Sequence, residues 1–331
     1  MKLRARVKAV SSRSKALLLR AAAQLGTADL AVFHDFVPAP WGGGSQFLVA
    51  LVKEIRSMGF VVEVNRLSAS TGSCLVNSFN FDADLFRHLR HEGVRVIHRV
   101  DGPVGAYRGF DDGTDERVEH INHEFANGTV FQSTYSLNTH AEMRLRMAEP
   151  HFVIRNAADP VIFNMLDRSM SSPAGKLRLI SSSWSNNPNK GFEVYQWLDD
   201  HLDWNRFEYT FVGRSPVELR RIKMVPPVGS RQLADLLKQH DVYVTASRND
   251  PCSNALIEAL SCGLPALYLR SGGHPEIVGE AGLGFDSPEE APLLLERLAS
   301  DYLSFQDQIH VPGIHDVAAA YLEALGLVHG K

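Results

Sequence analysis

Short apolar runs alternate with amphipathic segments from about residue 30 to the end of the chain. In the first half, the apolar runs predict strands over 30–34, 61–65, 74–77, 94–98, 128–131 and 152–154, and the amphipathic segments predict helices over 46–58, 82–91, 115–126 and 136–147. In the second half, strands are predicted over 177–181, 209–212, 242–245, 266–269 and 283–285, with helices between them and a last helix over 316–327. Such alternation is typical of parallel sheets joined by crossover helices, so it predicts an α/β fold.

A polar segment over 164–176, NMLDRSMSSPAGK, separates the two halves. It has few large apolar residues and is rich in Ser, Pro and Gly, as a linker is. With 331 residues, 44% of them hydrophobic, the chain is long enough for two domains of about 150 residues each. We therefore predict a basic extension over 1–25, Rossmann-like domains over 26–165 and 177–308, a linker over 166–176 and a C-terminal segment over 309–331.

Composition narrows the range of functions. A formal net charge of −4 argues against a general nucleic-acid-binding protein. The three cysteines, Cys74, Cys252 and Cys262, have no metal-like spacing and cannot form a framework of disulfides. No apolar run approaches the roughly 18 residues that cross a bilayer. The simplest location is a reducing cytoplasm.

The first 25 residues contain several Lys and Arg residues and no acidic residue. Because Arg13, Lys15 and Arg20 interrupt the apolar part, the segment makes a poor signal peptide. Its leucines and alanines suit the apolar side of a basic amphipathic helix lying on an anionic membrane. The alternative is a solvated, partly disordered extension. The composition of the basic extension thus leaves two predictions open: peripheral contact with the inner face of a membrane, or no membrane contact.

The segment 241–285 carries the strongest chemical signal. It predicts a strand, a polar loop, a short helix over 254–262 and another strand. Ser253 is the expected N-cap, and Gly263 and Pro265 end the helix. The first turn of a helix has unpaired N–H groups and the positive end of the helix dipole, so it favours an anion. Asp250 lies before that turn and Glu258 one turn inside, which suits a sugar joined to a nucleotide diphosphate.

These residues resemble the signature of retaining glycosyltransferases of family 4. The run from Asp250 to Glu258 is followed by A-L-S-C-G-L-P and by S-G-G-H-P-E-I-V over 271–278, although the family usually has Glu where this chain has Asp250. The resemblance implies the GT-B fold, in which two Rossmann-like domains face each other across a cleft, with the last helix packed back on the first domain. It also implies that Glu258 binds the ribose, Asp250 a hydroxyl of the donor sugar, and the backbone near Asn254 and Ala255 the diphosphate.

The segment 181–192, SSSWSNNPNKGF, contains a second part of the implied donor site. Relatives have an Arg and a Lys here, both on the diphosphate. Lys190 matches the Lys, but the Arg is absent. Charge or hydrogen bonds from neighbouring loops are the expected replacements, and the candidates are Asn186, Asn187, Arg248 and Arg270. The remaining donor-side candidates are Gly213 and Arg214 at the end of a strand, and Val228 in a loop that holds the base in relatives.

The resemblance implies that the first half contributes the acceptor side. W-G-G-G-S-Q-F over 41–47 follows a strand and opens a helix, and its Gly42, Gly43 and Gly44 let a backbone approach a ligand. V-I-H-R-V-D-G-P over 96–103 puts His98, Arg99 and Asp101 at a strand end. In many relatives a His here touches the donor sugar, and either His98 or Asp101 is the match. We favour Asp101 as the cleft-facing residue, and a hydrogen-bonded strand residue is an equally good interpretation of His98. The remaining cleft candidates are Asn156, in V-I-R-N-A-A-D-P-V-I-F over 153–163, and Ser271, Gly272 and Gly273.

No metal or other cofactor is expected. Asp111, Asp112 and Asp115 are better explained by a turn and a helix start, and His120 and His123 lack the Cys partners of a zinc site. The resemblance implies a metal-independent hexosyltransferase whose partners are a nucleotide sugar, with UDP or GDP favoured, and a glycan, lipid-linked or small-molecule acceptor. Two alternatives remain: a non-catalytic nucleotide-sugar-binding subunit, and a GT-B epimerase or phosphorylase.

Overall fold

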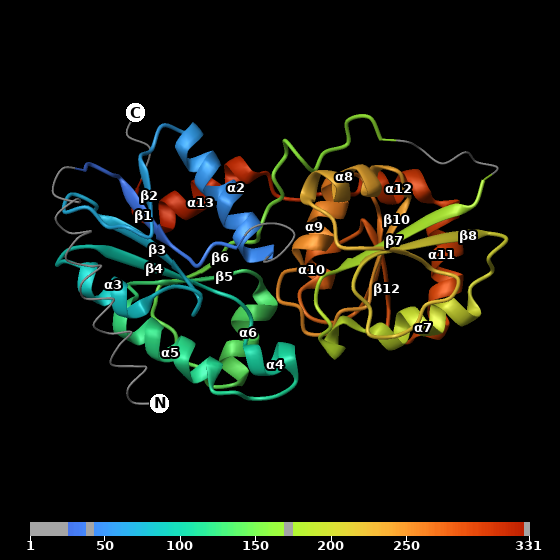
Figure 1. The fold of residues 1–331 in the computed structure, drawn as a ribbon, viewed down its shortest axis with the longest axis horizontal. Helices are drawn as coiled ribbons and strands as arrows, with labels where there is room; N and C mark the ends of the chain where they lie inside the picture. Colours follow the sequence, from blue (N-terminus) through green and yellow to red (C-terminus); the bar gives the residue numbers. More distant parts are fainter. Residues whose placement is uncertain (1–25, 38–42, 169–174, 328–331) are drawn as a thin grey trace.

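The computed structural model describes residues 26–37, 43–168 and 175–327, which form two α/β lobes side by side (Figure 1). The predicted extension over 1–25, Gly42 and part of the linker lie outside the described residues. Each lobe is built on a six-stranded sheet in which neighbouring strands run parallel. The α/β fold predicted from the alternating pattern is confirmed.

The first sheet has the strand order β2-β1-β3-β4-β5-β6. Its strands are β1 (Leu30–Phe33), β2 (Val62–Val64), β3 (Ser73–Asn77), β4 (Arg95–Val100), β5 (Thr129–Phe131) and β6 (His151–Val153). The helices of this lobe are α2 (Gly43–Ser57), α3 (Ala83–Leu89), α4 (Val104–Arg108), α5 (Thr114–Phe125) and α6 (Thr134–Glu142). Alternation along β1 explains the layers: Leu30 and Val32 join the core with α2, whereas Ala31 and Phe33 join the core with α3 and α5.

The second sheet has the strand order β12-β11-β10-β7-β8-β9. Its strands are β7 (Leu177–Ser183), β8 (Phe207–Gly213), β9 (Lys223–Val225), β10 (Val242–Thr245), β11 (Ala266–Leu269) and β12 (Gly282–Phe285). Its helices are η1 (Pro188–Lys190), α7 (Phe192–His201), α8 (Ser230–Lys238), α9 (Asn254–Ser261), α10 (His274–Val278), η2 (Pro288–Glu290), α11 (Ala291–Ser300) and α12 (Tyr302–Asp307). On β10, Tyr243 packs with α8 and α9, whereas Val242 and Val244 pack with α7 and α11.

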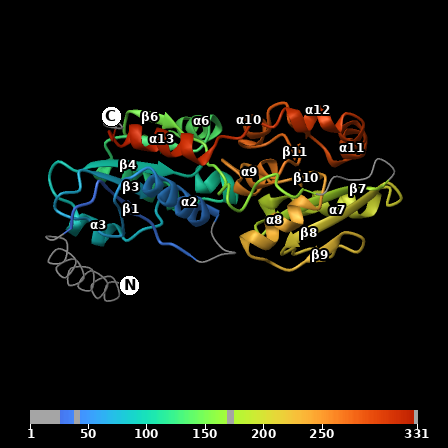
Figure 2. The ribbon, with the colours of Figure 1, turned by 90° about the horizontal axis from the view of Figure 1, so that it is seen from above.

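The last helix, α13 (Ile314–Ala324), returns to the first lobe and lies beside α2 in both views (Figures 1 and 2). Its buried Tyr321 and Leu322 belong to the same core as α2 and β1. Two polar contacts fix its end: Ser73 Oγ donates to the Leu325 carbonyl at 2.9 Å, and Arg95 Nε donates to the Ala324 carbonyl at 3.0 Å. The core of the first lobe is therefore built from both ends of the described chain.

Three local predictions were wrong. No helix was predicted between the strand over 94–98 and the helix over 115–126, but α4 lies there, and it is too short for a periodic pattern to reveal. The segment 223–225 forms the edge strand β9, although no strand was predicted between those over 209–212 and 242–245. The helix predicted over 136–147 ends at Glu142, because Arg144 takes a left-handed conformation with φ of 59°.

Polar contacts join the two lobes beside the cleft. The Glu276 carboxylate at α10 accepts hydrogen bonds from the backbone N–H groups of Thr134 and Tyr135 at the start of α6, at 3.1 and 3.0 Å. Asn249 Nδ2 donates to the Ala106 carbonyl on α4 at 3.0 Å. A carboxylate at a helix start also interacts favourably with the helix dipole. These contacts hold the carboxyl ends of the two sheets opposite each other.

Candidate active site

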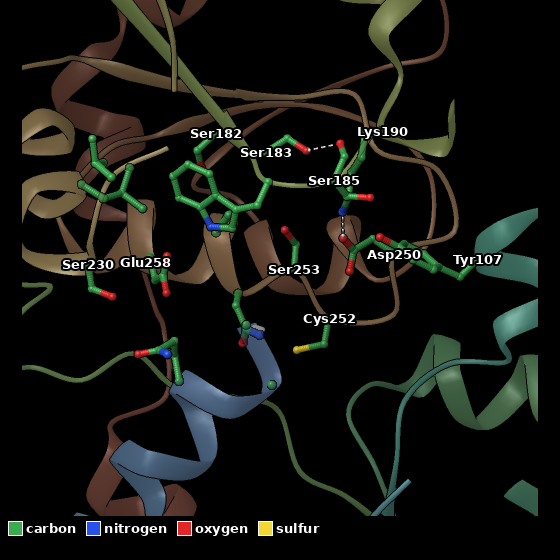
Figure 3. Close-up of a pocket in the computed structure, with 18 residues that line it drawn as sticks. Tyr107, Ser182, Ser183, Ser185, Lys190, Ser230, Asp250, Cys252, Ser253 and Glu258 are labelled. Atoms are coloured by element: carbon green, nitrogen blue, oxygen red, sulfur yellow. Dashed lines mark hydrogen bonds and ion pairs between the residues drawn. The ribbon is translucent and has the colours of Figure 1, made fainter. Parts of the chain in front are cut away.

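A cavity of about 420 Å³ lies at the carboxyl edge of the second sheet, where it faces the first lobe (Figure 3). The second lobe contributes the end of β7, η1, the loop after β10 and the start of α9. The first lobe contributes the start of α2 and Tyr107 of α4. Nine predicted residues line it: Gly43, Gly44, Lys190, Val228, Asp250, Ser253, Asn254, Ala255 and Glu258. Open parallel sheets bind ligands at this edge.

Helix α9 points its first turn into this cavity. The Ser253 side chain accepts a hydrogen bond from the Leu256 N–H at 3.4 Å, as expected of the N-cap, and Gly263 follows the helix with φ of +82°. The N–H groups of Asn254 and Ala255 precede any intrahelical acceptor and remain available. The structure thus has the predicted anion-favouring helix start.

Lys190 and Asp250 form an ion pair in the wall of the cavity, with Nζ and Oδ2 3.0 Å apart. Gly191 allows this placement, because its φ is +74° and a Cβ there would lie 2.2 Å from the Ala246 carbonyl oxygen. Burial alone would lower the pKa of Lys190, but the Asp250 carboxylate and Tyr107 outweigh it and raise that pKa. Burial alone would raise the pKa of Asp250, but Lys190 lowers it. Both groups are therefore charged near neutral pH.

Glu258 lies one turn farther along α9. Its carboxyl group has no hydrogen-bond or ion-pair partner among the residues that the structure describes, and burial raises its pKa to about 8. An acidic side chain in this state is neutral for much of the time at pH 7. A half-buried carboxyl group that lines the cavity without a protein partner suits a ligand that supplies hydroxyl donors.

A second cavity of about 370 Å³ adjoins the first and is lined mainly by the first lobe. It contains the imidazole of His34, the carboxylates of Asp35 and Asp101, and the ring of Phe79. Five residues line both cavities: Gly44, Tyr107, Asp250, Cys252 and Asn254. The two volumes therefore meet at the start of α9 and at the Lys190–Asp250 pair.

Arg99 on β4, to which we assigned no role from the sequence, is the centre of a group of polar contacts at the boundary between the lobes. It is fully buried and donates to Asn77 Oδ1 at 2.6 Å and Asn156 Oδ1 at 2.9 Å. It also contacts Asp101 Oδ1 at 3.3 Å. Asn156 in turn donates to Asn254 Oδ1 at 2.9 Å, across the lobes. An arginine inside the apolar run V-I-H-R-V was the available signal, since a buried cation needs partners.

The structure corrects two predicted cleft residues. His98 is fully buried: its Nε2 contacts the Ser78 carbonyl at 3.0 Å, its Nδ1 contacts Asn122, and it lines neither cavity. Burial lowers its pKa to about 4, so it stays neutral. Asn156 is also fully buried and braces Arg99 rather than facing the cleft. Of the two alternatives at the end of β4, Asp101 is the one that reaches a cavity.

The predicted cleft turn over 271–273 supports the Asp250 loop instead of lining a cavity. Ser271 Oγ accepts from the Asn249 N–H at 2.9 Å, and the Gly273 N–H donates to the Asp250 carbonyl at 2.9 Å. Gly272 has φ of +63°, and a Cβ there would lie 2.4 Å from the Asp250 carbonyl oxygen. The Gly273 N–H is therefore already used and cannot meet a phosphate.

The residues expected to replace the missing arginine do not line the first cavity. Arg248 pairs with Glu193, and Arg270 pairs with Asp286, both on exposed surface. Asn187 Oδ1 accepts from the Asn189 N–H and caps η1. Five serines line the cavity, three of them in the segment where the arginine is missing: Ser182, Ser183, Ser185, Ser230 and Ser253.

Two donor-side candidates lie outside both cavities. Gly213 has φ of +128°, and a Cβ there would lie 1.8 Å from the Ser183 carbonyl oxygen, so its role is the close approach of β8 to β7. Arg214 is exposed and lines neither cavity.

The acidic cluster noted in the sequence has a structural explanation. Asp112 pairs with Arg108 at 2.6 Å, and the Asp115 carboxylate accepts from the N–H groups of Val104 and Gly105 at the start of α4. Within the described ranges, no group of three His, Cys, Asp or Glu residues has the geometry to hold a metal. No helix in those ranges is long and apolar enough to cross a membrane.

Solved structures show the same arrangement of lobes. The TM-score is 0.65 with Anabaena HepE in complex with UDP and glucose, at 15% identity, covering 90% of this chain and 99% of that chain. It is 0.66 with the catalytic domain of starch synthase IV from Arabidopsis thaliana bound to ADP and acarbose, at 11% identity, covering 91% and 99%. At these identities the similarity shows the fold alone, and it confirms the predicted GT-B architecture.

Residues 194–323 match the family model described as glycosyl transferases group 1. The chain is 31% identical over 105 residues to D-inositol 3-phosphate glycosyltransferase of Streptomyces scabiei, covering 32% of this chain and 23% of that protein. It is 32% identical over 85 residues to the phosphatidylinositol N-acetylglucosaminyltransferase gpi3 subunit of Schizosaccharomyces pombe, covering 25% and 19%. The matches thus span about a fifth of the length of these relatives. The resemblance to glycosyltransferases found in the sequence is therefore confirmed by the match to this family model and by the shared fold.

Proposed function

We propose that this chain, with its group 1 glycosyl transferase sequence on a GT-B fold, is a retaining, metal-independent glycosyltransferase. It would move a hexosyl group from a nucleotide diphosphate sugar to a glycan, lipid-linked or small-molecule acceptor. The observation that carries the proposal is the junction of the two cavities at Asp250 and Asn254, beside the free N–H groups of α9. A donor in one volume and an acceptor in the other would meet there.

The diphosphate is assigned to the start of α9. The N–H groups of Asn254 and Ala255 suit its oxygens. Ser253 Oγ already accepts from Leu256, and Ser185 Oγ accepts from the Asn187 N–H at 3.1 Å, so each hydroxyl keeps its own proton to donate. Of these donors, Ser185 lies in the segment where relatives have an arginine.

The nucleoside is assigned to the far end of the same cavity. Glu258 would accept hydrogen bonds from the ribose hydroxyls, and Val228 would contact the base. UDP is the preferred nucleotide, because the HepE structure contains UDP and glucose, and GDP is the second choice.

Catalysis in this proposal is mainly electrostatic. A transition state with oxocarbenium character places negative charge on the departing diphosphate, and Lys190 and the α9 helix start stabilise it more strongly than they stabilise the ground state. The Asp250 carboxylate offsets part of the Lys190 charge. The Asp250 carboxylate is also placed to accept a hydrogen bond from a hydroxyl group of the donor sugar. The leaving phosphate takes the acceptor proton, so no separate general base is assigned.

A two-step experiment tests this function. A thermal-shift panel of UDP, GDP, dTDP and ADP identifies the nucleotide, since a bound ligand raises the melting temperature. Release of that nucleotide from its sugar conjugates is then measured with and without acceptors. Lys190→Ala and Glu258→Gln should reduce release, whereas Lys223→Ala and Glu208→Gln, on exposed strand positions away from both cavities, should not.

The alternatives give different results in the same experiment. Binding without turnover across donors and acceptors would indicate a non-catalytic subunit. Epimerisation or phosphorolysis without any glycosyl acceptor would indicate the other GT-B activities. The proposed location is the cytoplasm, with the basic extension over 1–25 in contact with an anionic membrane. Equal co-sedimentation with anionic vesicles after removal of residues 1–25 would exclude that contact.

A further inference from the structure

The second cavity has an unusual balance of charge. Among the described residues that line it, Asp35, Asp101 and Asp250 carry carboxylates, whereas Arg108 is its only Lys or Arg. Arg108 is already paired with Asp112 at 2.6 Å. The cavity therefore offers a ligand no unpaired cation from these residues.

The three carboxylates differ in their partners. Asp101 contacts Arg99 at 3.3 Å, and Asp250 contacts Lys190 at 3.0 Å, so the negative charge of each carboxylate is offset by a paired cation. Asp35 lies on the exposed rim, where no Lys or Arg of the described chain is within ion-pair distance. The cavity thus has one uncompensated negative charge at its entrance.

The remaining wall suits a polyhydroxylated ring. Apolar surface comes from Val37, Phe79, Val104 and Pro251, and hydrogen-bond acceptors come from the carboxylates. His34 and Asn77 are bonded to each other at 3.2 Å, so much of their capacity is used within the protein. Carboxylates accept hydrogen bonds from hydroxyl groups and repel phosphate, whose oxygens are also acceptors and carry negative charge.

We propose that the acceptor group entering this second cavity is an uncharged sugar, and that any phosphate of the acceptor stays outside. This inference rests on the proposed function, which makes the second cavity the acceptor side. Asp35 acts as a specificity-determining residue at the entrance, because its charge disfavours a phosphorylated ring.

The test compares matched acceptors with the active donor. Nucleotide release is measured with glucose and glucose 6-phosphate, and with myo-inositol and inositol 1-phosphate, together with a panel of uncharged disaccharides. We expect kcat/KM for uncharged acceptors to exceed that for phosphorylated ones at least tenfold. Asp35→Lys should reduce this ratio several-fold, whereas Asp235→Lys, on an exposed position of α8, should leave it unchanged.

Each other outcome overturns the inference. Equal or better use of a phosphorylated acceptor would show that the cavity accommodates phosphate. An unchanged ratio in Asp35→Lys would show that the rim charge does not select. Failure of every uncharged acceptor to accelerate release, in a protein that still binds its donor by calorimetry, would also overturn it. Absence of donor binding would instead contradict the proposed function itself, so the two failures are distinguishable.

Discussion

Replacing Glu258 with Gln should weaken nucleotide binding much more at pH 9 than at pH 7. Burial raises the pKa of this carboxyl group to about 8. Ribose hydroxyls donate to a carboxylate, so the bound state favours the ionised form and lowers the pKa. Below pH 8 the wild-type protein must therefore lose a proton before it binds well. Gln has no proton to lose, so its affinity should not follow the same pH dependence.

The magnitude follows from the pKa. With a value of about 8, roughly nine in ten Glu258 side chains are protonated at pH 7 and one in ten at pH 9. Because most wild-type molecules must first lose this proton, their apparent affinity at pH 7 is about 11-fold lower than that of the fully ionised form, a difference of ~1.4 kcal/mol. At pH 9 the difference nearly disappears. The ratio of the Kd of Glu258→Gln to that of the wild type should rise roughly tenfold between these pH values.

Isothermal titration calorimetry in buffers of different ionisation enthalpy measures both affinity and proton release. The wild type should release about 0.9 proton more per nucleotide than Glu258→Gln at pH 7, and the nucleotide's own ionisation cancels in the comparison. The same carboxyl affects stability without ligand: its raised pKa means that the folded protein loses stability as pH rises from about 4.5 to about 8. Equal Kd ratios at pH 7 and pH 9 would refute this reasoning.

Three further changes test the supports of the site. Asp250→Asn leaves the Lys190 ammonium without its counter-charge. The free energy of unfolding, measured by denaturant titration, should fall by roughly 3 kcal/mol. This is the lower end of the range for a buried pair, because the Lys190 and Asp250 side chains remain 17% and 11% exposed. A loss under about 1 kcal/mol would show that the pair is not effectively buried. Gly272→Ala would place a Cβ 2.4 Å from the Asp250 carbonyl oxygen, so both the melting temperature and turnover should fall, and normal turnover would contradict the supporting role of this turn. Glu276→Gln removes the charge that caps α6 across the lobes, so small-angle X-ray scattering should show a larger radius of gyration; an unchanged radius would mean that other contacts keep the lobes together.

Local signals explain which elements could be predicted. The strands over 242–245 and 266–269 match β10 and β11 because buried parallel strands are continuous apolar runs between polar loops. Helix α9 begins at Asn254 as expected because its N-cap, Ser253, lies next to it in the sequence. Lys190 and Glu258, which the resemblance to family 4 implies as donor-site residues, both line the first cavity.

The errors arose where orientation depends on distant partners. Sequence places both Arg248 and Arg270 near the cleft edge, but their charges are taken by Glu193 and Asp286. His98 precedes Asp101 by only three residues, yet it turns into the core, where it contacts Asn122 on α5. No local pattern shows which side of a strand end a neighbouring helix will cover.

The return of α13 to the first lobe has a consequence for biosynthesis. During synthesis β1 emerges before the second lobe, but the hydrophobic layer over that strand lacks Tyr321 and Leu322 until the second lobe has also emerged. The second lobe, although translated later, has all its described strands and helices before that point. The half of the molecule that is made first is therefore the half that finishes folding last, and loss of the final helix would damage the lobe farthest from it in sequence.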